Sequence, residues 1–476
     1  MTRIKKDLIV FFILVLFSPL LFYNLGGFGL ADFDEGWYAG ISANILKTGQ
    51  PLVLAFNGET YTDHPPLGFI ITAISFAIFG QNEFAARLPQ ALAGLGSLIV
   101  LYLIGKNIFN RAIGLGASLI LVSTVWFVLR ARTGDLDSLF LFFYLLCAYG
   151  AIKAARSQKW LIPFGILGAL LLSVKSLIGI SIVAVSLVFI TRSYIKSKLF
   201  PTRQIILSLL AFLAIILAWF LPNLALKGSY YINHMIDIGL KNQSRMKPNF
   251  SDIFASLTFQ YLHFGIRKWF YPAIISLIGA LVFLRKFPVL IYIYSIIFIL
   301  LLGFLTNAKT EIWHIIPLYP FLSLLISFFL YHSLSFVLKV IRTGKNASLW
   351  AGCTTCILIA AVCVFQIYKF KDEINLFTKS KSGLVITAQA ARGKPEELFL
   401  DNTYFLPGTV FYSGKNVKSV QSESPPRNLV KGLVEGSNNP ILILTEQYRL
   451  DTDKVDTKKY NVIAKSEGNV LIITNP

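Results

Sequence analysis

Residues 7–25 read DLIVFFILVLFSPLLFYNL, and residues 31–38 read ADFDEGWY. The first stretch is an apolar run long enough to cross a membrane. The second stretch places three carboxylates, those of Asp32, Asp34 and Glu35, within four positions shortly after that run. Carboxylates are costly inside a bilayer and are not needed for anchoring, so this cluster indicates chemistry rather than folding.

The composition of the chain is that of a membrane protein. Of its 476 residues, 55% are hydrophobic and 14% are charged, whereas a soluble domain carries about 25% charged residues. Apolar runs recur from Leu8 to about Tyr368, which predicts an all-α polytopic membrane protein with about 11–13 transmembrane helices. The net charge of +20 does not indicate nucleic-acid binding, because the basic residues lie in short loops between the apolar runs.

The basic loops set the predicted topology. We predict spans at 7–25, 85–105, 111–130, 136–155, 160–174, 176–192, 204–224, 270–285, 288–306, 315–339 and 347–368. The apolar run 66–80 is rather short for a span, and leaving it out places every basic loop on one side, which is then cytoplasmic. We therefore expect residues 66–80 to form a helix in the outer interface, within a first outer loop at 26–84.

The last hundred residues differ from the rest. Residues 371–476 are richer in charged residues, Asn and Ser, and their apolar runs shorten to strand length at 384–388, 397–400, 441–444 and 470–474. We predict a transmembrane domain at 1–370 and a small extracytoplasmic α/β domain at 371–476. The membrane is expected to be the cytoplasmic (inner) membrane of a bacterial-type cell.

Ionisable residues collect on the predicted outer side. They are Asp32, Asp34, Glu35, Asp63, His64, Arg130, Arg132, Asp135, Asp137, Lys175, the loop from about 227 to 268 with Arg245, and the segment from Lys309 to His314. Only the basic loops determined the topology, yet the acidic residues and histidines gather on the other face. This predicts an outward-facing active site.

Six motifs in this order carry a family resemblance. They are Asp34-Glu35-x-x-Tyr38, Asn57-Gly58-x-x-Tyr61-x-x-His64-Pro65-Pro66-Leu67, Asn82-Glu83-Phe84-Ala85-Ala86-Arg87-Leu88-Pro89, Arg130-x-Arg132 through Asp137, Lys175 between two apolar runs, and His314-x-x-Pro317-x-x-Pro320. Together they resemble the GT-C membrane glycosyltransferases, in the branch that contains the aminoarabinose transferases and the protein O-mannosyltransferases. The resemblance covers residues 1 to about 330.

The resemblance implies a reaction and roles for residues. The donor would be a polyprenyl phosphate that bears one sugar, and the acceptor would attack the anomeric carbon with inversion while the lipid phosphate leaves. Asp34 matches the family's loop aspartate and would be the base. The expected donor-binding residues are Glu35, Tyr38, Asp63, His64, Arg130, Arg132, Lys175, Arg245, Lys309 and His314. Asp137, with Asp63 or Glu35, could hold a divalent ion of unknown identity, and no nucleotide or organic cofactor is expected.

Several alternatives stay open at this point. Lys175 could extend to an interface, Arg130 and Asp137 could form a structural ion pair, and His314 could be an ordinary interfacial residue. The sequence has Asp63-His64 where the aminoarabinose transferases have an acidic–lysine pair, so the sugar could be aminoarabinose, mannose or another hexose.

The acceptor is open as well. The chain lacks the large outer-loop domain of the eukaryotic protein O-mannosyltransferases, which favours a lipid or glycolipid acceptor such as lipid A over a protein. A transporter or flippase for a lipid-linked sugar is the alternative of another class. It predicts ionisable residues near the middle of the membrane, whereas here they gather at one face.

Overall fold

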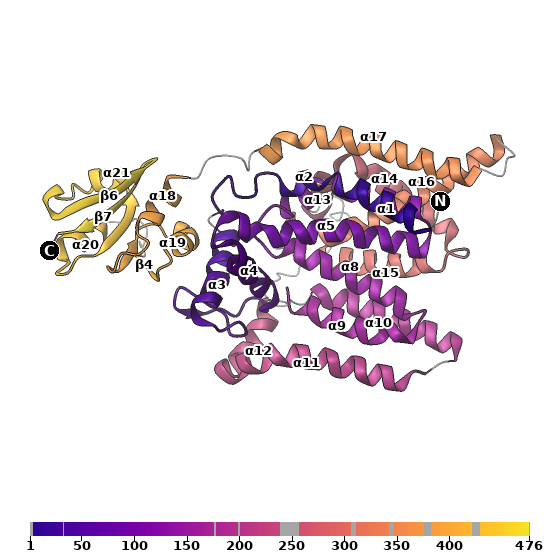
Figure 1. The fold of residues 1–476 in the computed structure, drawn as a ribbon, viewed down its shortest axis with the longest axis horizontal. Coiled ribbons are helices and arrows are strands. Elements are labelled where there is room, and N and C mark those ends of the chain that lie inside the picture. The colour runs from indigo at the N-terminus through magenta and orange to yellow at the C-terminus, as the bar shows by residue number, and fades with distance from the viewer. Residues whose placement is uncertain are drawn as a thin grey trace.

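The computed structural model describes residues 3–31, 33–175, 178–198, 200–238, 257–305, 311–341, 347–375, 382–420 and 429–475. Long helices run side by side in a bundle, and a smaller domain with a sheet lies beyond one end of it (Figure 1). The prediction of a mostly helical membrane protein with a small C-terminal α/β domain is confirmed.

Seven segments in the described ranges are long and apolar enough to cross a membrane. They contain α5 (Glu83–Ile108), α8 (Asp137–Ala154), α10 (Ile178–Ser197), α11 (Thr202–Lys227), α13 (Leu257–Ile266) with α14 (Phe270–Gly279), α16 (Tyr319–Ile341) and α17 (Ala347–Asn375). Shorter apolar helices correspond to the other predicted spans: α1 (Arg3–Val15) with α2 (Ser18–Phe22), α6 (Arg111–Val122), α9 (Leu161–Leu172) and α15 (Val289–Leu305).

Two predicted spans are interrupted. The run 7–25 divides between α1 and α2 just before Pro19, because proline cannot donate the backbone hydrogen bond that would continue the first helix. The run 111–130 divides into α6 and α7 (Val125–Arg130) at Ser123 and Thr124. The side-chain hydroxyls of these two residues donate to the carbonyls of Ile120 and Leu121, at 2.8 and 2.7 Å.

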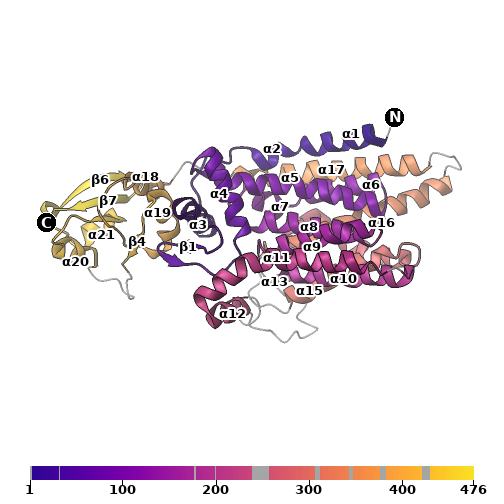
Figure 2. The same cartoon turned by 60° about the horizontal axis from the view of Figure 1, so that its bottom comes forward.

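The first outer loop forms ordered structure at one end of the bundle. It contains α3 (Asp34–Thr48), the hairpin of β1 (Ala55–Phe56) and β2 (Glu59–Thr60), and α4 (Leu67–Phe79). Gly49 follows the last residue of α3 and caps the helix with a φ of 69°, the left-handed conformation that glycine adopts freely. Figure 2 places α3 and α4 at the end of the bundle that faces the C-terminal domain, together with α12 (Ser229–Ile236).

The C-terminal domain is built on a five-stranded sheet in the order β4-β3-β5-β7-β6. Its strands are β3 (Leu398–Leu400), β4 (Val417–Ser419), β5 (Leu442–Glu446), β6 (Tyr460–Ser466) and β7 (Asn469–Thr474). The strands β4, β3 and β5 are parallel, and β7 is antiparallel to both β5 and β6. Helices cover both faces: α18 (Gly383–Ala390) and α19 (Leu406–Ser413) on one, and α20 (Leu429–Gly436) and α21 (Gln447–Thr452) on the other.

The strand predicted at 384–388 is wrong, because these residues lie in α18. A short apolar run does not by itself distinguish a strand from a buried helix. The predicted domain boundary at residue 370 falls inside α17, which continues to Asn375.

The domain is attached to the first outer loop by close contacts. The Leu30 N–H donates to the Tyr412 hydroxyl at 2.7 Å, and that hydroxyl donates to Glu83 at 3.1 Å. A Cβ on Gly36 of α3 would lie 2.8 Å from the backbone nitrogen of Gly408 in α19, so only glycine allows this approach. The helix that begins with Asp34 is therefore packed against the C-terminal domain.

Candidate active site

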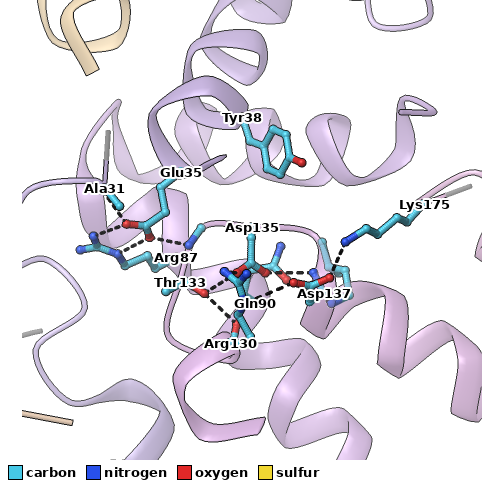
Figure 3. A network of polar contacts seen from close by, with 12 residues as sticks. Ala31, Glu35, Tyr38, Arg87, Gln90, Arg130, Thr133, Asp135, Asp137 and Lys175 are labelled. Carbon is cyan, nitrogen blue, oxygen red and sulfur yellow. Dashed lines mark hydrogen bonds and ion pairs between the residues drawn. The ribbon is translucent and has the colours of Figure 1, made fainter. Parts of the chain in front are cut away.

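The candidate site begins at the first turn of α3. Asp34 and Glu35 are the first two residues of this helix, and neighbouring helical side chains point about 100° apart. Glu35 is 4% exposed and points toward Arg87 of α5, whereas Tyr38 points toward the side of Lys175 (Figure 3). Asp34 lies one turn before Tyr38 on the same face of α3.

Glu35 is held by a buried ion pair. Its two carboxylate oxygens accept from Nε and Nη2 of Arg87, each at 2.8 Å, and from the backbone N–H groups of Ala31 and Gly134 at 2.8 and 2.5 Å. Burial alone would raise the pKa of Glu35, but the Arg87 charge and these hydrogen bonds outweigh it and lower the pKa below its ordinary value. These partners occupy both carboxylate oxygens of Glu35 and give it a structural contact, and its predicted donor-binding or metal-binding role stays a prediction.

Arg87 in turn closes the loop before α3. The guanidinium is fully buried, and its remaining donors reach three backbone carbonyls at 2.8 to 3.0 Å, those of Leu25, Phe28 and Gly29. The ion pair thus connects three segments: α5, the loop leading into α3, and the loop at Gly134.

A second ionic cluster lies next to this pair, toward Lys175 (Figure 3). Asp137, the first residue of α8, binds Lys175 Nζ at 2.5 Å and lies 3.3 Å from Arg130 Nε. Arg130 also binds Asp135 at 2.6 Å, and Asp135 accepts from the Thr133 hydroxyl (Figure 3). The structure brings together three predicted site residues, Arg130, Asp137 and Lys175.

This cluster borders a small pocket. The pocket has a volume of about 50 Å³ and is lined by Asp137, Lys175, Trp313 and His314, among others. The Arg130 guanidinium lies over the Trp313 ring, 4.0 Å from its centre. Burial and the nearby Lys175 charge lower the pKa of His314 to about 4, so its imidazole is neutral at pH 7. Its Nδ1 accepts from the Glu311 N–H at 3.2 Å, which leaves the proton on Nε2.

Asp34 lies within electrostatic range of this cluster. Burial raises the pKa of its carboxyl group, while the charges of Lys175 and Arg130 oppose that shift. Because a general base works best when its pKa approaches the working pH, this raised pKa suits the base role predicted for Asp34.

Tyr38 and His64 bind each other beside Asp34. His64 Nδ1 lies 2.7 Å from the backbone carbonyl of Asp63, which can only accept, so Nδ1 carries the proton. His64 Nε2 then accepts from the Tyr38 hydroxyl at 3.0 Å. Burial lowers the pKa of His64 to about 4, so this residue is neutral where the aminoarabinose transferases have a lysine.

The three predicted metal ligands are not brought together. Asp137 is bound by Lys175, Glu35 by Arg87, and Asp63 by His234 of α12, whose Nε2 lies 2.7 Å from the Asp63 carboxylate. Within the described ranges, no three His, Cys, Asp or Glu side chains form a group that could hold a metal ion. Asp63 and His234 are 171 residues apart in the sequence, and they bring together a carboxylate and an imidazole, two side-chain types that bind metal ions.

Other predicted residues lie elsewhere. Arg132 is 1% exposed and donates to the Leu20 carbonyl at 2.9 Å, on the α2 side and away from Lys175, so it is not part of this cluster. Asp32, Arg245 and Lys309 lie outside the described residues.

Sequence reasoning assigned no role to several residues that organise the site. Arg87 is an arginine inside an apolar run, which is unusual enough to indicate a buried partner. Asp135 and Thr133 lie between motif residues but match no spacing rule. The contact between His234 and Asp63 depends on the direction that α12 takes after the turn at Gly228, and local sequence does not specify it.

The Glu35–Arg87 pair can be tested by stability. We expect Arg87→Met to lower the free energy of unfolding by about 3–5 kcal/mol, because it leaves a buried carboxylate without a counter-charge. Thermal unfolding of the purified protein in detergent measures the change. Lys418→Met is the matched control, since Lys418 and its partner Glu397 are both 60% exposed and such pairs contribute about 1 kcal/mol or less. Equal unfolding temperatures for Arg87→Met and the wild-type protein would contradict the assignment.

Comparison with known proteins agrees with the motifs. The family model for dolichyl-phosphate-mannose-protein mannosyltransferase matches residues 63–225. An undecaprenyl phosphate-alpha-4-amino-4-deoxy-L-arabinose arabinosyl transferase of Pseudomonas fluorescens is 32% identical over 131 residues, 27% of this chain and 24% of that protein. The polyprenol-phosphate-mannose–protein mannosyltransferase of Mycobacterium tuberculosis is 31% identical over 160 residues, 33% of this chain and 30% of that protein. These matches span less than a third of each relative.

The fold is matched over the full length. The crystal structure of ArnT from Cupriavidus metallidurans bound to undecaprenyl phosphate aligns with a TM-score of 0.74 at 15% identity, and covers 100% of both chains. The resemblance first seen in the motifs is confirmed at the level of the fold: this chain is a multi-pass membrane protein with the GT-C fold of ArnT. Parts of its sequence are similar to the aminoarabinose transferases and the polyprenol-phosphate-mannose mannosyltransferases.

Proposed function

We propose that this protein transfers a single sugar from a polyprenyl-phosphate donor to an acceptor hydroxyl at the outer face of the membrane, with inversion at the anomeric carbon. The observation that carries the proposal is the placement of a half-buried Asp34, with a raised pKa, beside the cluster of Lys175, Asp137 and Arg130 in a GT-C fold.

The proposed reaction needs a group that takes the proton of the attacking hydroxyl. The acceptor oxygen forms a bond to the anomeric carbon, the bond from that carbon to the phosphate oxygen breaks, and the polyprenyl phosphate leaves with the electron pair. The hydroxyl proton goes to Asp34. A base of this kind contributes about 10²–10⁴-fold to the rate.

The leaving phosphate gains negative charge and requires cations. Lys175 and Arg130 are placed to bind it, and the neutral His314 has an N–H to donate. The two cations, however, face three carboxylates, those of Asp34, Asp135 and Asp137. This balance favours a further cation when the donor binds.

A divalent ion is our proposal for that cation. The Asp63 carboxylate and the His234 imidazole meet beside the Tyr38–His64 pair and would hold it, with water or donor oxygens as the other ligands. Bound there, the ion would add positive charge near the phosphate. The predicted cations Arg245 and Lys309 are the alternative source.

The proposed acceptor and sugar follow from the relatives and from the positions at which this sequence differs from the aminoarabinose transferases. A lipid or glycolipid, such as lipid A, is the preferred acceptor, and a protein acceptor is the runner-up because one relative is named a protein mannosyltransferase. His64 is neutral and stands in place of a lysine, so we propose mannose or another hexose as the sugar on an equal footing with aminoarabinose. A transporter is disfavoured, because the ionic cluster lies at helix ends rather than midway along the helices.

We expect Asp34→Asn to reduce sugar transfer by about 10²–10⁴-fold, because an amide cannot accept the proton. The assay is transfer from a polyprenyl-phosphate sugar by purified protein. Glu59→Gln, an exposed carboxylate change in the same loop, is the control. In the wild-type protein, activity should fall as the pH drops through the raised pKa of Asp34, since only the ionised carboxylate is a base. Full activity of Asp34→Asn would remove this residue from the mechanism.

Metal content provides a separate test. We expect purified protein to contain a divalent ion by elemental analysis, and expect both the ion and the activity to be lost after EDTA treatment and restored by adding metal. Asp63→Ala and His234→Ala should each reduce the metal content, whereas His263→Ala, which packs on Phe270, should not. Unchanged activity after EDTA treatment would contradict the metal proposal.

The proposed orientation is tested by labelling. Lys159→Cys should react with a membrane-impermeant maleimide only after the cells are opened, and Glu59→Cys should react in intact cells. Both positions are exposed, and Cys353 and Cys356 are first replaced by serine. Labelling of Lys159→Cys in intact cells would reverse the topology.

A further inference from the structure

A larger pocket lies on the far side of α3 from the ionic cluster. It has a volume of about 400 Å³, against about 50 Å³ for the pocket at Lys175. Ligand-binding pockets typically have about 300–1,000 Å³, so this one can hold a small molecule or part of a larger one. Its walls come from the second half of α3, from Asn57, from Gln81 after α4, and from residues 392–393, 410–411 and 413–416 of the C-terminal domain.

The walls of this pocket are fixed to each other. The Asn57 side chain accepts from the Val417 N–H at 2.6 Å and donates to the Val417 carbonyl at 2.9 Å, which joins the β1–β2 hairpin to β4. The close approach of Gly36 to Gly408 joins α3 to α19. The pocket is therefore a built feature of the junction between the two domains.

Its charged lining is entirely basic among the described residues that form it. Lys47, Arg392 and Lys415 line the pocket, and no Asp or Glu does. The Lys415 ammonium is held by the carbonyls of Lys394 and Glu396, which uses two of its three N–H donors. This excess of positive charge favours a negatively charged ligand.

The remaining polar lining consists mainly of amides. Asn44, Gln81 and Asn416 contribute side chains that both donate and accept hydrogen bonds, as sugar hydroxyls do. Gln81 also accepts from Arg392 at 3.2 Å, which orients its amide. Phe411 and Val410 add an apolar surface.

The pocket and Asp34 both lie at the end of the bundle that carries α3. Both are reached along α3, and Asn44 is ten residues after Asp34 in this helix, which corresponds to about 15 Å at 1.5 Å per residue. A ligand in the pocket would not compete with the reacting sugar, but a longer molecule could reach both places.

We propose that this pocket binds an anionic saccharide, that is, a sugar unit bearing a phosphate or carboxylate group. Lys47 and Arg392 contact the anionic group, and the amides contact the hydroxyls. The further assignment of this saccharide as a distal part of the acceptor rests on the proposed transferase function, whereas the binding itself does not.

The test is equilibrium binding to the purified full-length protein, with trehalose 6-phosphate as the probe. We expect saturable binding of this probe, and weaker binding of uncharged trehalose and of inorganic phosphate. The double variant Lys47→Gln/Arg392→Gln should bind the probe about tenfold more weakly, because it loses two charge-assisted contacts. Arg392→Lys should retain part of the affinity, and Lys418→Gln, a change of an exposed lysine outside the pocket, should retain all of it.

Other results would overturn the proposal. Unchanged probe affinity in the double variant places the binding elsewhere, and equal affinity for inorganic phosphate and the sugar phosphate reduces the pocket to an anion site. Thermal unfolding verifies that the double variant is folded. Asp34→Asn should bind the probe normally, so a failure of the transferase proposal and a failure of this one are distinguished.

Discussion

The buried ion pair between Glu35 and Arg87 determines where the candidate base lies. It accounts for both carboxylate oxygens of Glu35 and, through the carbonyls of residues 25, 28 and 29, fixes the chain that leads into α3. Because neighbouring side chains on a helix diverge, anchoring Glu35 on α5 leaves Tyr38 turned toward Lys175 (Figure 3). Asp34 lies one turn before Tyr38 on the same face of α3, within electrostatic range of Lys175. A buried pair of this kind is costly to break, so the geometry of the candidate site depends on a structural contact made by the residue next to Asp34.

The buried charged residues around α3 form two groups. One set is saturated and structural: Glu35 with Arg87. The other is a compact network of Arg130, Asp135, Asp137 and Lys175, partly open to a small pocket. Here carboxylates already balance the cations, so under the proposed function the donor phosphate has to compete with these carboxylates or bind together with a further cation. The C-terminal domain also contributes to the position of Asp34, because its helix α19 packs on α3, the helix that begins with Asp34.

Hydropathy and the order of the motifs were sufficient to predict the fold, because burial in lipid requires long apolar helices. The membership of the site was harder to predict. The sequence analysis grouped Arg130, Asp137 and Lys175, which the structure brings into contact, but it also grouped Glu35 and Arg132 with them. Which way a side chain turns depends on its tertiary partners: Glu35 has Arg87, 52 residues later, and Arg132 reaches the Leu20 carbonyl. The pairing of Asp63 with His234, 171 residues apart, likewise follows from the folded chain and not from any local spacing.

The central claim is that Asp34 acts as a base and not as a nucleophile. The most direct test is the anomeric configuration of the product, determined by NMR after transfer from a polyprenyl-phosphate sugar of known configuration. Direct attack by the acceptor, with Asp34 removing its proton, predicts an inverted anomeric centre. A retained configuration would contradict the account, because it requires a covalent glycosyl–enzyme intermediate formed by a carboxylate that attacks the sugar itself.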